Sequence, residues 1–229
     1  MTIRKWIMSL SLCAALLLCF VPMSAQAAGE ASVNYIERSW NGTEVVSETK
    51  TMQAQPVPSN GNMTSGWYYL NGDVTNNGRV ETITGDVCLI LCDGYTLDVK
   101  GLYIPAGSTL TIYGQTAGTG KIYSHPSGGA AIGGYSGHDN GNIVIHGGTI
   151  EANGYNNCAG IGSNDGRTGG VITIYGGTIT AKGGSNGAAI GGGENGEGGD
   201  PVLPIRRVEE HDDEDGDQEQ DQDQEEEQE

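Results

Sequence analysis

Three acidic side chains lie at comparable points of a loop-rich, repeated segment. Asp165 and Glu194 are 29 residues apart, and Asp139 and Arg167 lie in the same loops. Carboxylates beside an arginine are the residue types found in the groove of a polysaccharide lyase. Such an enzyme uses Ca²⁺ and a base to act on an acidic sugar. The same residues stand among Gly and Asn, where exposed charge is ordinary. We therefore assign no catalytic residue, and Ca²⁺ binding or polysaccharide cleavage at these carboxylates stays an alternative.

Three aromatic side chains form a second candidate set. Tyr113, His146 and Tyr175 each precede a glycine at an expected corner of the chain. Side chains at this position should point outward, which predicts an exposed aromatic column with Cys92 below it. Sugar rings stack on flat aromatic surfaces of this kind, so these three residues are the candidate ligand-binding set. The alternative is a ladder of rings that stabilises the strands by covering their backbone.

Cysteine chemistry is limited in the part of the chain after residue 27. It contains Cys88, Cys92 and Cys158, which is an odd number. Cys88 and Cys92 are four residues apart on an expected strand, about 13 Å, which is too far for a mutual disulfide. The C-x-x-C spacing of a metal site is absent. We expect small, partly buried thiols, and pairing of one of them across coils stays open.

A 29-residue repeat organises the middle of the chain and places these side chains. Ala130–Gly134 (AAIGG) recurs as AGIGS at 159–163 and as AAIGG at 188–192. In the same frame, IVIHGGTI at 143–150 returns as ITIYGGTI at 172–179. A looser copy, with LTIYG at 110–114, precedes them. Repeats of this period are the signature of a solenoid, in which each unit buries its apolar face against the next.

Each unit contains three short apolar stretches between glycine-rich corners. Alternation with a period of two directs Ile143 and Ile145 to one side and Val144 to the other. Stacking in register should place Ile143 against Ile172 inside an aliphatic column. With the usual right-handed crossover, this predicts an all-β, right-handed parallel β-helix of about four coils.

The remaining segments divide the chain into four parts. Residues 1–27 are typical of a secretory signal peptide, with Arg4 and Lys5 before an apolar run and an A-x-A site. Residues 28–65 contain Asn41-Gly42, which predicts a β-hairpin that caps the first coil with Trp40 or Trp67, a small independent binding module being the alternative. The β-helix itself is expected over 66–199. The acidic residues 200–229 should form a disordered tail.

The repeat stops abruptly near its C-terminal end. After Gly198-Gly199 the frame predicts another strand, but the sequence contains Pro201 and Pro204, which donate no ladder hydrogen bonds. We therefore expect the last coil, which begins at Ala188, to remain incomplete. One hypothesis is that the chain is a shortened or frame-disrupted member of a longer repeat array.

Composition excludes some partners. The 229 residues carry 11 Lys and Arg against 29 Asp and Glu, a formal net charge of −18. Sequence-independent nucleic-acid binding needs a positive surface, so we expect no nucleic-acid partner. The apolar run near the N-terminus is too short for a typical membrane helix, so we expect no membrane span once the signal is cleaved.

The blocks AGSTLTIYGQ (106–115), GGAAIGG and IYGGTITAKGG resemble repeats of secreted or cell-surface bacterial proteins with right-handed parallel β-helix domains, the solenoid class that includes pectate lyases. The resemblance covers roughly residues 66–193 and implies extracellular localisation, with adhesion or contact to a glycan or cell-wall polysaccharide. It transfers no catalytic residue and no cofactor. The sequence therefore favours a non-enzymatic binding module, with a polysaccharide-active enzyme or a structural spacer as the alternatives.

Overall fold

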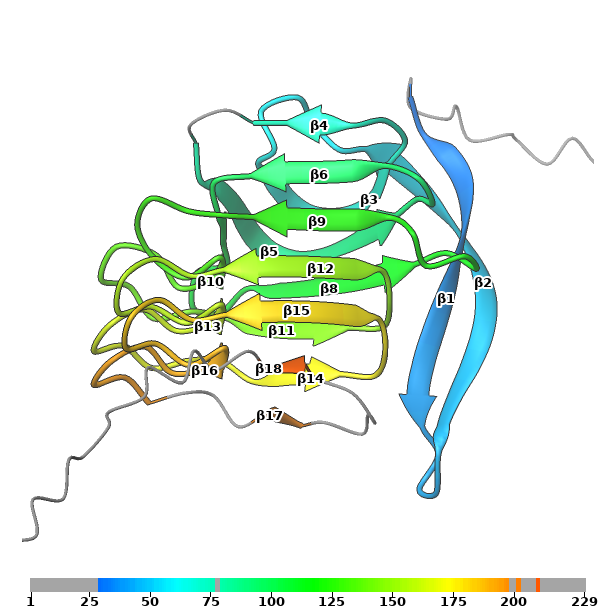
Figure 1. Cartoon of the computed structure of the whole chain (residues 1–229). Helices are drawn as coiled ribbons and strands as arrows, with labels where there is room; N and C mark the ends of the chain where they lie inside the picture. The colour runs from blue at the N-terminus through cyan, green and yellow to red at the C-terminus, as the bar shows by residue number, and fades with distance from the viewer. Residues whose placement is uncertain (1–28, 77–78, 198–200, 203–208, 211–229) are drawn as a thin grey trace, which may run out of the picture.

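The computed structural model describes residues 29–76, 79–197, 201–202 and 209–210, and all regular elements in these ranges are β-strands. The strands after the N-terminal hairpin wind into a right-handed parallel β-helix (Figure 1). This confirms the predicted fold class. No helix among the described residues is long and apolar enough to cross a membrane.

Three sheets run along the β-helix, and neighbouring turns pair in parallel. The first contains β3 (Met63–Leu70), β5 (Glu81–Leu91), β8 (Thr109–Gly114), β11 (Asn142–Ile145), β14 (Ile172–Ile174) and β17 (Pro201–Val202). The second contains β4 (Val74–Thr75), β6 (Thr96–Val99), β9 (Lys121–Ser124), β12 (Thr149–Asn153), β15 (Thr178–Lys182) and β18 (Glu209–Glu210). The third contains the start of β5, β7 (Leu102–Tyr103), β10 (Ile132–Gly133), β13 (Ile161–Gly162) and β16 (Ile190–Gly191).

The register confirms the repeat where the repeat is regular. Ile143 pairs with Ile172 and Ile161 pairs with Ile190, each a step of 29 residues. Earlier turns have other lengths, since Leu110 pairs with Ile143 after 33 residues. The β-helix has about five turns, one more than expected, because the shorter N-terminal turns lack the glycine-rich frame.

The core consists of aliphatic columns between the three sheets. Along the central strands, alternate residues are buried and stack on their equivalents in the next turn, as Leu89, Ile112, Ile145 and Ile174 do in the first sheet. Among the described residues, Tyr68, which is 4% exposed, contributes the only aromatic ring to this core. Narrow aliphatic layers therefore replace the broad core of a typical globular domain.

A column of glycines is needed in the third sheet. Gly133, Gly162 and Gly191 stack in the third sheet with φ values of 134°, 136° and 131°, a region that side chains rarely adopt. A Cβ on Gly133 would overlap the carbonyl oxygen of Gly162. The backbones of successive turns therefore approach closely only because this column has no side chains.

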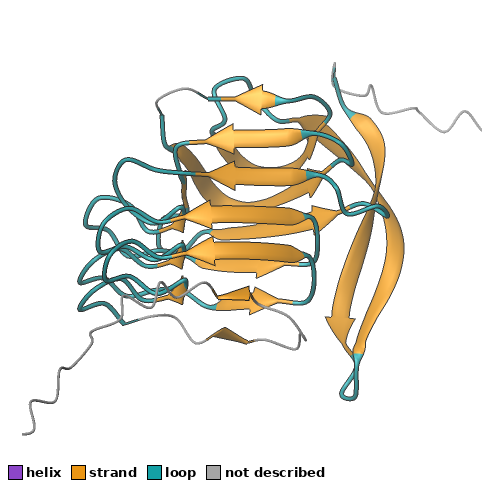
Figure 2. Cartoon of the chain, in the orientation of Figure 1, coloured by secondary structure: helices purple, strands orange, loops and turns teal. Residues whose placement is uncertain are grey.

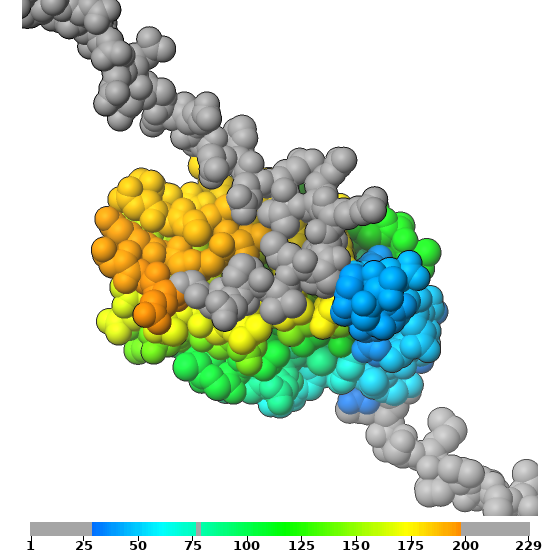
Figure 3. All heavy atoms as spheres, turned by 90° about the horizontal axis from the view of Figure 1, so that it is seen from below, coloured from blue at the N-terminus to red at the C-terminus, as the bar shows by residue number. Residues whose placement is uncertain are grey.

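The N-terminal hairpin forms as predicted but lies in a different place. Strands β1 (Ala31–Trp40) and β2 (Val45–Pro56) pair antiparallel over ten residues. The hairpin stands upright along one flank of the solenoid, across its rungs, rather than over the open end (Figures 1 and 3). It is joined there by the Ile36–Gly114 bridge and by pairing of β2 with β3.

The expectation that Trp40 closes the first coil is therefore wrong: its side chain is 50% exposed near the hairpin turn. Trp67 lies in β3 and packs against the hairpin residue Tyr35, with ring centroids 5.1 Å apart. The flank, and not the end of the stack, is the surface that the hairpin covers.

The C-terminal end continues further than predicted. Strand β17 pairs with β14 through Pro201 and Val202, and β18 pairs with β15 through Glu209 and Glu210. Proline is tolerated here because an edge strand does not need every N–H donor. The rest of the expected acidic tail and the expected signal peptide lie outside the described residues.

Candidate functional site

The predicted aromatic column exists, but most of it is covered. Tyr113 stacks on His146 with ring centroids 4.6 Å apart, and His146 stacks on Tyr175 at 5.1 Å. Tyr113 is 6% and His146 is 8% exposed, while Tyr175 is half-buried. The prediction of an exposed ridge is wrong for the first two residues, because the hairpin lies over them.

The neighbours of the column also differ from the prediction. Ile90, and not Cys92, pairs with Tyr113 in the turn below. On the outer side, Tyr35 from β1 contacts Tyr113 edge-on at 4.7 Å, and Trp67 from β3 stacks on it at 5.3 Å. The rings form a closed apolar cluster, which favours the interpretation as a stabilising ladder.

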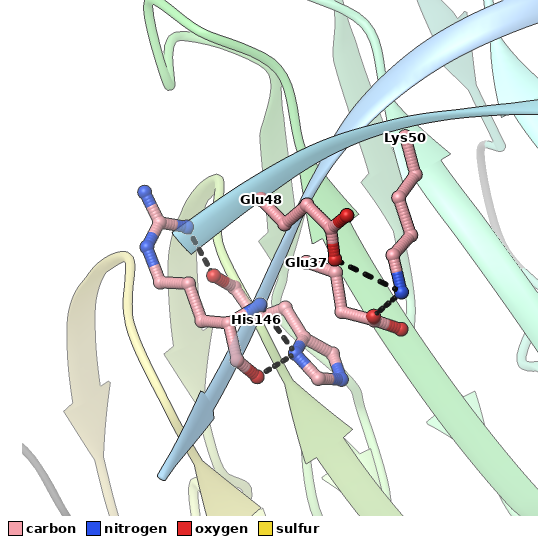
Figure 4. A network of polar contacts seen from close by, with 5 residues as sticks. Glu37, Glu48, Lys50 and His146 are labelled. Carbon is pink, nitrogen blue, oxygen red and sulfur yellow. Dashed lines mark hydrogen bonds and ion pairs between the residues drawn. The ribbon is translucent and has the colours of Figure 1, made fainter. Parts of the chain in front are cut away.

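Arg38 fastens the hairpin to this column (Figure 4). The Nδ1 atom of His146 lies 3.1 Å from the backbone nitrogen of Arg38 and 2.7 Å from its carbonyl oxygen. The Arg38 guanidinium also donates a hydrogen bond to the carbonyl oxygen of His146. It passes over Gly147 and Gly176, where a Cβ would approach its atoms to 2.6 Å. These two glycines leave the space that the arginine occupies.

Burial changes the acid–base behaviour of the covered groups. It lowers the pKa of His146 and raises the pKa of Tyr113, so both side chains are favoured in their neutral forms. It also raises the pKa of Cys88 to about 11 and that of Cys92 in the same direction. These thiols are therefore poor nucleophiles.

All three described cysteines are free, with Cys88 and Cys92 half-buried and Cys158 buried. This confirms the expectation of partly buried thiols. The Cys158 thiol donates to the side-chain oxygen of Asn164 at 2.6 Å, so it has a local structural partner.

The predicted acidic residues lie on stacked loops without forming one cluster. Asp139 accepts a hydrogen bond from the backbone N–H of Thr168 at 3.1 Å, and the Asp165 carboxylate lies 3.5 Å from the amide nitrogen of Asn157. Gly166 donates to the carbonyl oxygen of Glu194, which joins the adjacent loops through their backbones. Among the described residues, no group of three or more His, Cys, Asp or Glu side chains is placed to hold a metal ion.

Loops gather on the side of the solenoid away from the hairpin (Figure 2). A different aromatic group comes from β7 and the loop that follows β10. We call Tyr103, Tyr135 and His138 the corner cluster. The ring of Tyr103 lies 6.1 Å from that of Tyr135 and 6.1 Å from that of His138. Both tyrosines are half-buried and His138 is exposed. The cluster therefore presents ring surface and polar edges to solvent.

Charged groups flank the corner cluster. Arg167, in the loop of the next turn, lies with Nη2 3.6 Å from the position of a Cβ on Gly137. Asp139 follows His138 directly and is exposed. The arrangement combines aromatic faces with a cationic fork donor and a carboxylate acceptor within neighbouring loops.

Sequence reasoning missed the corner cluster for a specific reason. Tyr135 and His138 occupy the positions that Asn164 and Arg167 hold one repeat later, so the sequence does show aromatic residues at these two positions of the earlier repeat. Tyr103 pairs with Gly133, a step of 30 residues, and therefore falls outside the 29-residue frame. Only the three-dimensional register brings it to the other two rings.

A cleft of about 200 Å³ lies where the hairpin meets the loops after β5 and β8. Its polar groups are largely engaged with one another. Gln115 donates to the carbonyl oxygen of Asn34, and Asp93 accepts from the backbone N–H groups of Ala117 and Thr119. These bonds hold the hairpin and the turns together, and we assign the cleft no ligand.

The comparisons with known proteins agree with the architecture. Residues 143–165 and 172–194 match a family model described as a β-helix repeat. The comparisons with curated proteins and with solved structures gave no match. The two matched segments and the in-register stacking of parallel strands both support a parallel β-helix fold built from repeats.

Proposed function

We propose that this chain is a secreted or surface-displayed, non-enzymatic module that binds carbohydrate through the corner cluster. The observation that carries the proposal is the solvent-accessible grouping of two half-buried tyrosines, Tyr103 and Tyr135, with the exposed His138 beside Arg167. The residues that resemble a secretory signal support the extracellular location.

The chemistry of this grouping suits a sugar. A pyranose ring offers C–H faces that pack on aromatic rings and hydroxyl rims that hydrogen-bond to charged and polar groups. Tyr103 and Tyr135 supply the ring surface, while Arg167 and Asp139 supply a donor and an acceptor. Arginine also recognises a carboxylate in a bidentate way, which favours acidic sugars over neutral ones.

The covered column is a weaker site for the same ligand. Tyr113 and His146 are already stacked on other rings and closed off by the hairpin, so a sugar would reach them only after the hairpin left. Tyr175 is the one member at the C-terminal end of the column that keeps partial exposure. It extends the ladder, and we propose no independent binding role for it.

The test is binding of the full chain to immobilised glycans and cell-wall polysaccharides, with Tyr103→Ala and Tyr135→Ala as variants. We expect each variant to weaken retention at least about tenfold, the size of effect that loss of about 1.4 kcal/mol of contact gives. Tyr155→Ala is the matched control, because Tyr155 is 42% exposed and lies outside the cluster. Thermal unfolding of each variant checks that the fold is retained.

Other outcomes would assign the chain to a different class. Undiminished retention in both cluster variants would overturn the proposed site. Polysaccharide turnover that disappears in Asp165→Asn would support the enzyme alternative, with Asp139, Asp165 and Glu194 as its carboxylates. If the chain neither binds nor cleaves any of the polysaccharides tested, the result would support the structural-spacer alternative.

A further inference from the structure

Strand β2 has one long side without a partner strand in the described ranges. Its other side pairs with β1 from Val45 to Ala54, and β3 adds pairing only at Gln55 and Pro56. Edge strands expose N–H and C=O groups that can pair with another chain. The segment Val45–Thr51 is therefore a ready template for strand addition.

The hydrogen bonds of β1 show which β2 residues use this edge. In an antiparallel pair, opposite residues alternate between those that bond to each other and those whose N–H and C=O point away. The backbone N and O of Arg38 both point to the His146 ring (Figure 4). The carbonyl oxygen of Asn34 accepts a hydrogen bond from Gln115. Their β2 partners Ser47 and Thr51 must then point outward.

The same alternation places Thr49 midway between these two residues. Thr49 pairs with Ile36, which lies two residues from both Arg38 and Asn34, so its N–H and C=O also point to the free edge. Ser47, Thr49 and Thr51 are exposed. These three residues supply a row of outward hydrogen-bonding groups centred on Thr49.

We propose that the free edge of β2 pairs with β2 of a second copy of this chain, antiparallel and about a twofold axis at Thr49. This register places Ser47 opposite Thr51 of the second copy. It also places Glu48 opposite the second copy's Lys50, and Lys50 opposite its Glu48. The two hairpins then form one continuous four-stranded antiparallel sheet.

Charge complementarity selects this partner. A strand that pairs with itself usually sets some like charges opposite each other, which is unfavourable. Here the only charged residues of the segment 45–53 are Glu48 and Lys50, and they are symmetric about Thr49. Lys50 already bonds Glu37 and approaches Glu48 at 3.4 Å within one chain, so the second copy extends an existing ion-pair network (Figure 4).

Cysteine cross-linking tests the register. Opposite, hydrogen-bonded residues in an antiparallel pair have Cα atoms about 5.5 Å apart, within the range of a disulfide. We expect Thr49→Cys in the full chain to form a covalent dimer under mild oxidation, in large excess over the wild type. Ser47→Cys is the matched control, and it should gain a cross-link only when combined with Thr51→Cys. Equal cross-linking of Ser47→Cys alone would overturn the proposed register.

Sedimentation equilibrium tests the association itself. We expect the full chain to dimerise reversibly and Thr49→Pro to weaken the dimer at least about tenfold, because proline removes the central outward N–H. Thr49→Val keeps this N–H and is expected to dimerise like the wild type. The proposal would be overturned if the wild-type chain stayed monomeric at 100-fold the protein concentration used in the glycan-binding assays. A dimer that Thr49→Pro does not weaken would overturn it as well.

Discussion

The outward faces of the first and second sheets differ in their side chains and in whether the hairpin covers them. Both sheets turn aliphatic side chains inward in register. Outward, the first sheet carries Ile90, Tyr113 and His146 and is covered by the hairpin. The second carries Asp98, Tyr123, Glu151 and Thr180 in one column and is not covered by the hairpin (Figure 1). The face that the hairpin covers is therefore the one whose outward residues are mostly apolar and aromatic.

The uncovered face satisfies its charges locally. Lys121 pairs with Glu151 across one rung, and the His125 ring stacks on Tyr123 at 4.5 Å while facing Asp98 at 3.5 Å. The covered face instead buries rings against rings. Removing a side chain should therefore cost much more on the first sheet than at the equivalent place on the second.

The largest effect is expected for Tyr113→Ala. This change leaves a cavity among Tyr35, Trp67 and His146, and large-to-small changes of buried rings typically cost about 3 kcal/mol. Urea unfolding monitored by circular dichroism measures the loss. Tyr123→Ala on the second sheet is the matched control and should cost about 0.5 kcal/mol. Equal losses would show that the hairpin adds nothing to the packing of the covered face.

A smaller effect is expected from pH at the covered face. Because burial lowers the pKa of His146 below its ordinary value, the unfolded chain binds a proton more readily than the folded one. The contribution of neutral His146 to the free energy of unfolding is therefore present above a pH of about 6.5 and is lost as the pH falls below that value. His146→Gln should remove this part of the slope in the free energy of unfolding. An unchanged slope would contradict a buried, neutral His146.

Glu81 must be separated from this effect because it acts in the opposite direction. It is 1% exposed, its Oε2 has no described partner, and burial raises its pKa to about 7. The folded state holds the proton more tightly, so stability is present below pH of about 4.5 and is lost as pH rises through about 7. We expect Glu81→Gln to abolish this loss in the same unfolding experiment. If stability declined more steeply with rising pH in Glu81→Gln than in the wild type, Glu81 would not be the cause of this loss.

The smallest effect is expected for the ion pair of the uncovered face. Lys121 and Glu151 are each about one-third exposed, and surface pairs of this kind contribute about 0.5 kcal/mol or less. Glu151→Gln should therefore shift the urea midpoint only slightly, and the shift should shrink further in 1 M salt. A loss comparable to that of Tyr113→Ala would remove the contrast between the two faces.

The parts predictable from sequence are those set by short-range patterns. Alternation in ITI at 172–174 and its repetition from IVI at 143–145 gave the inward columns and their pairing. The stacking of His146 on Tyr175 followed from the same spacing. The prediction that this column is exposed was wrong, because the covering residues belong to the distant hairpin and share no repeat with it. Tyr35 is 78 positions from Tyr113, and Arg38 is 108 positions from His146.

The corner cluster shows the same limit. Tyr135 and His138 lie in a loop of the repeat, but the approach of Tyr103 depends on a turn of irregular length. The acidic residues were likewise placed on stacked loops, while their separation into individual hydrogen bonds depended on backbone geometry. The enzyme alternative at these carboxylates stays a prediction.

The amino-acid sequence by itself determined the strand period, the aliphatic interior and the glycine corners, since each depends on residues that recur at fixed steps along the chain. The tertiary structure alone decided which outward face is closed and which aromatic rings remain open. That choice rests on the docking of a non-repeated hairpin, whose contacts join residues 108 positions apart, and no local pattern specifies such a contact.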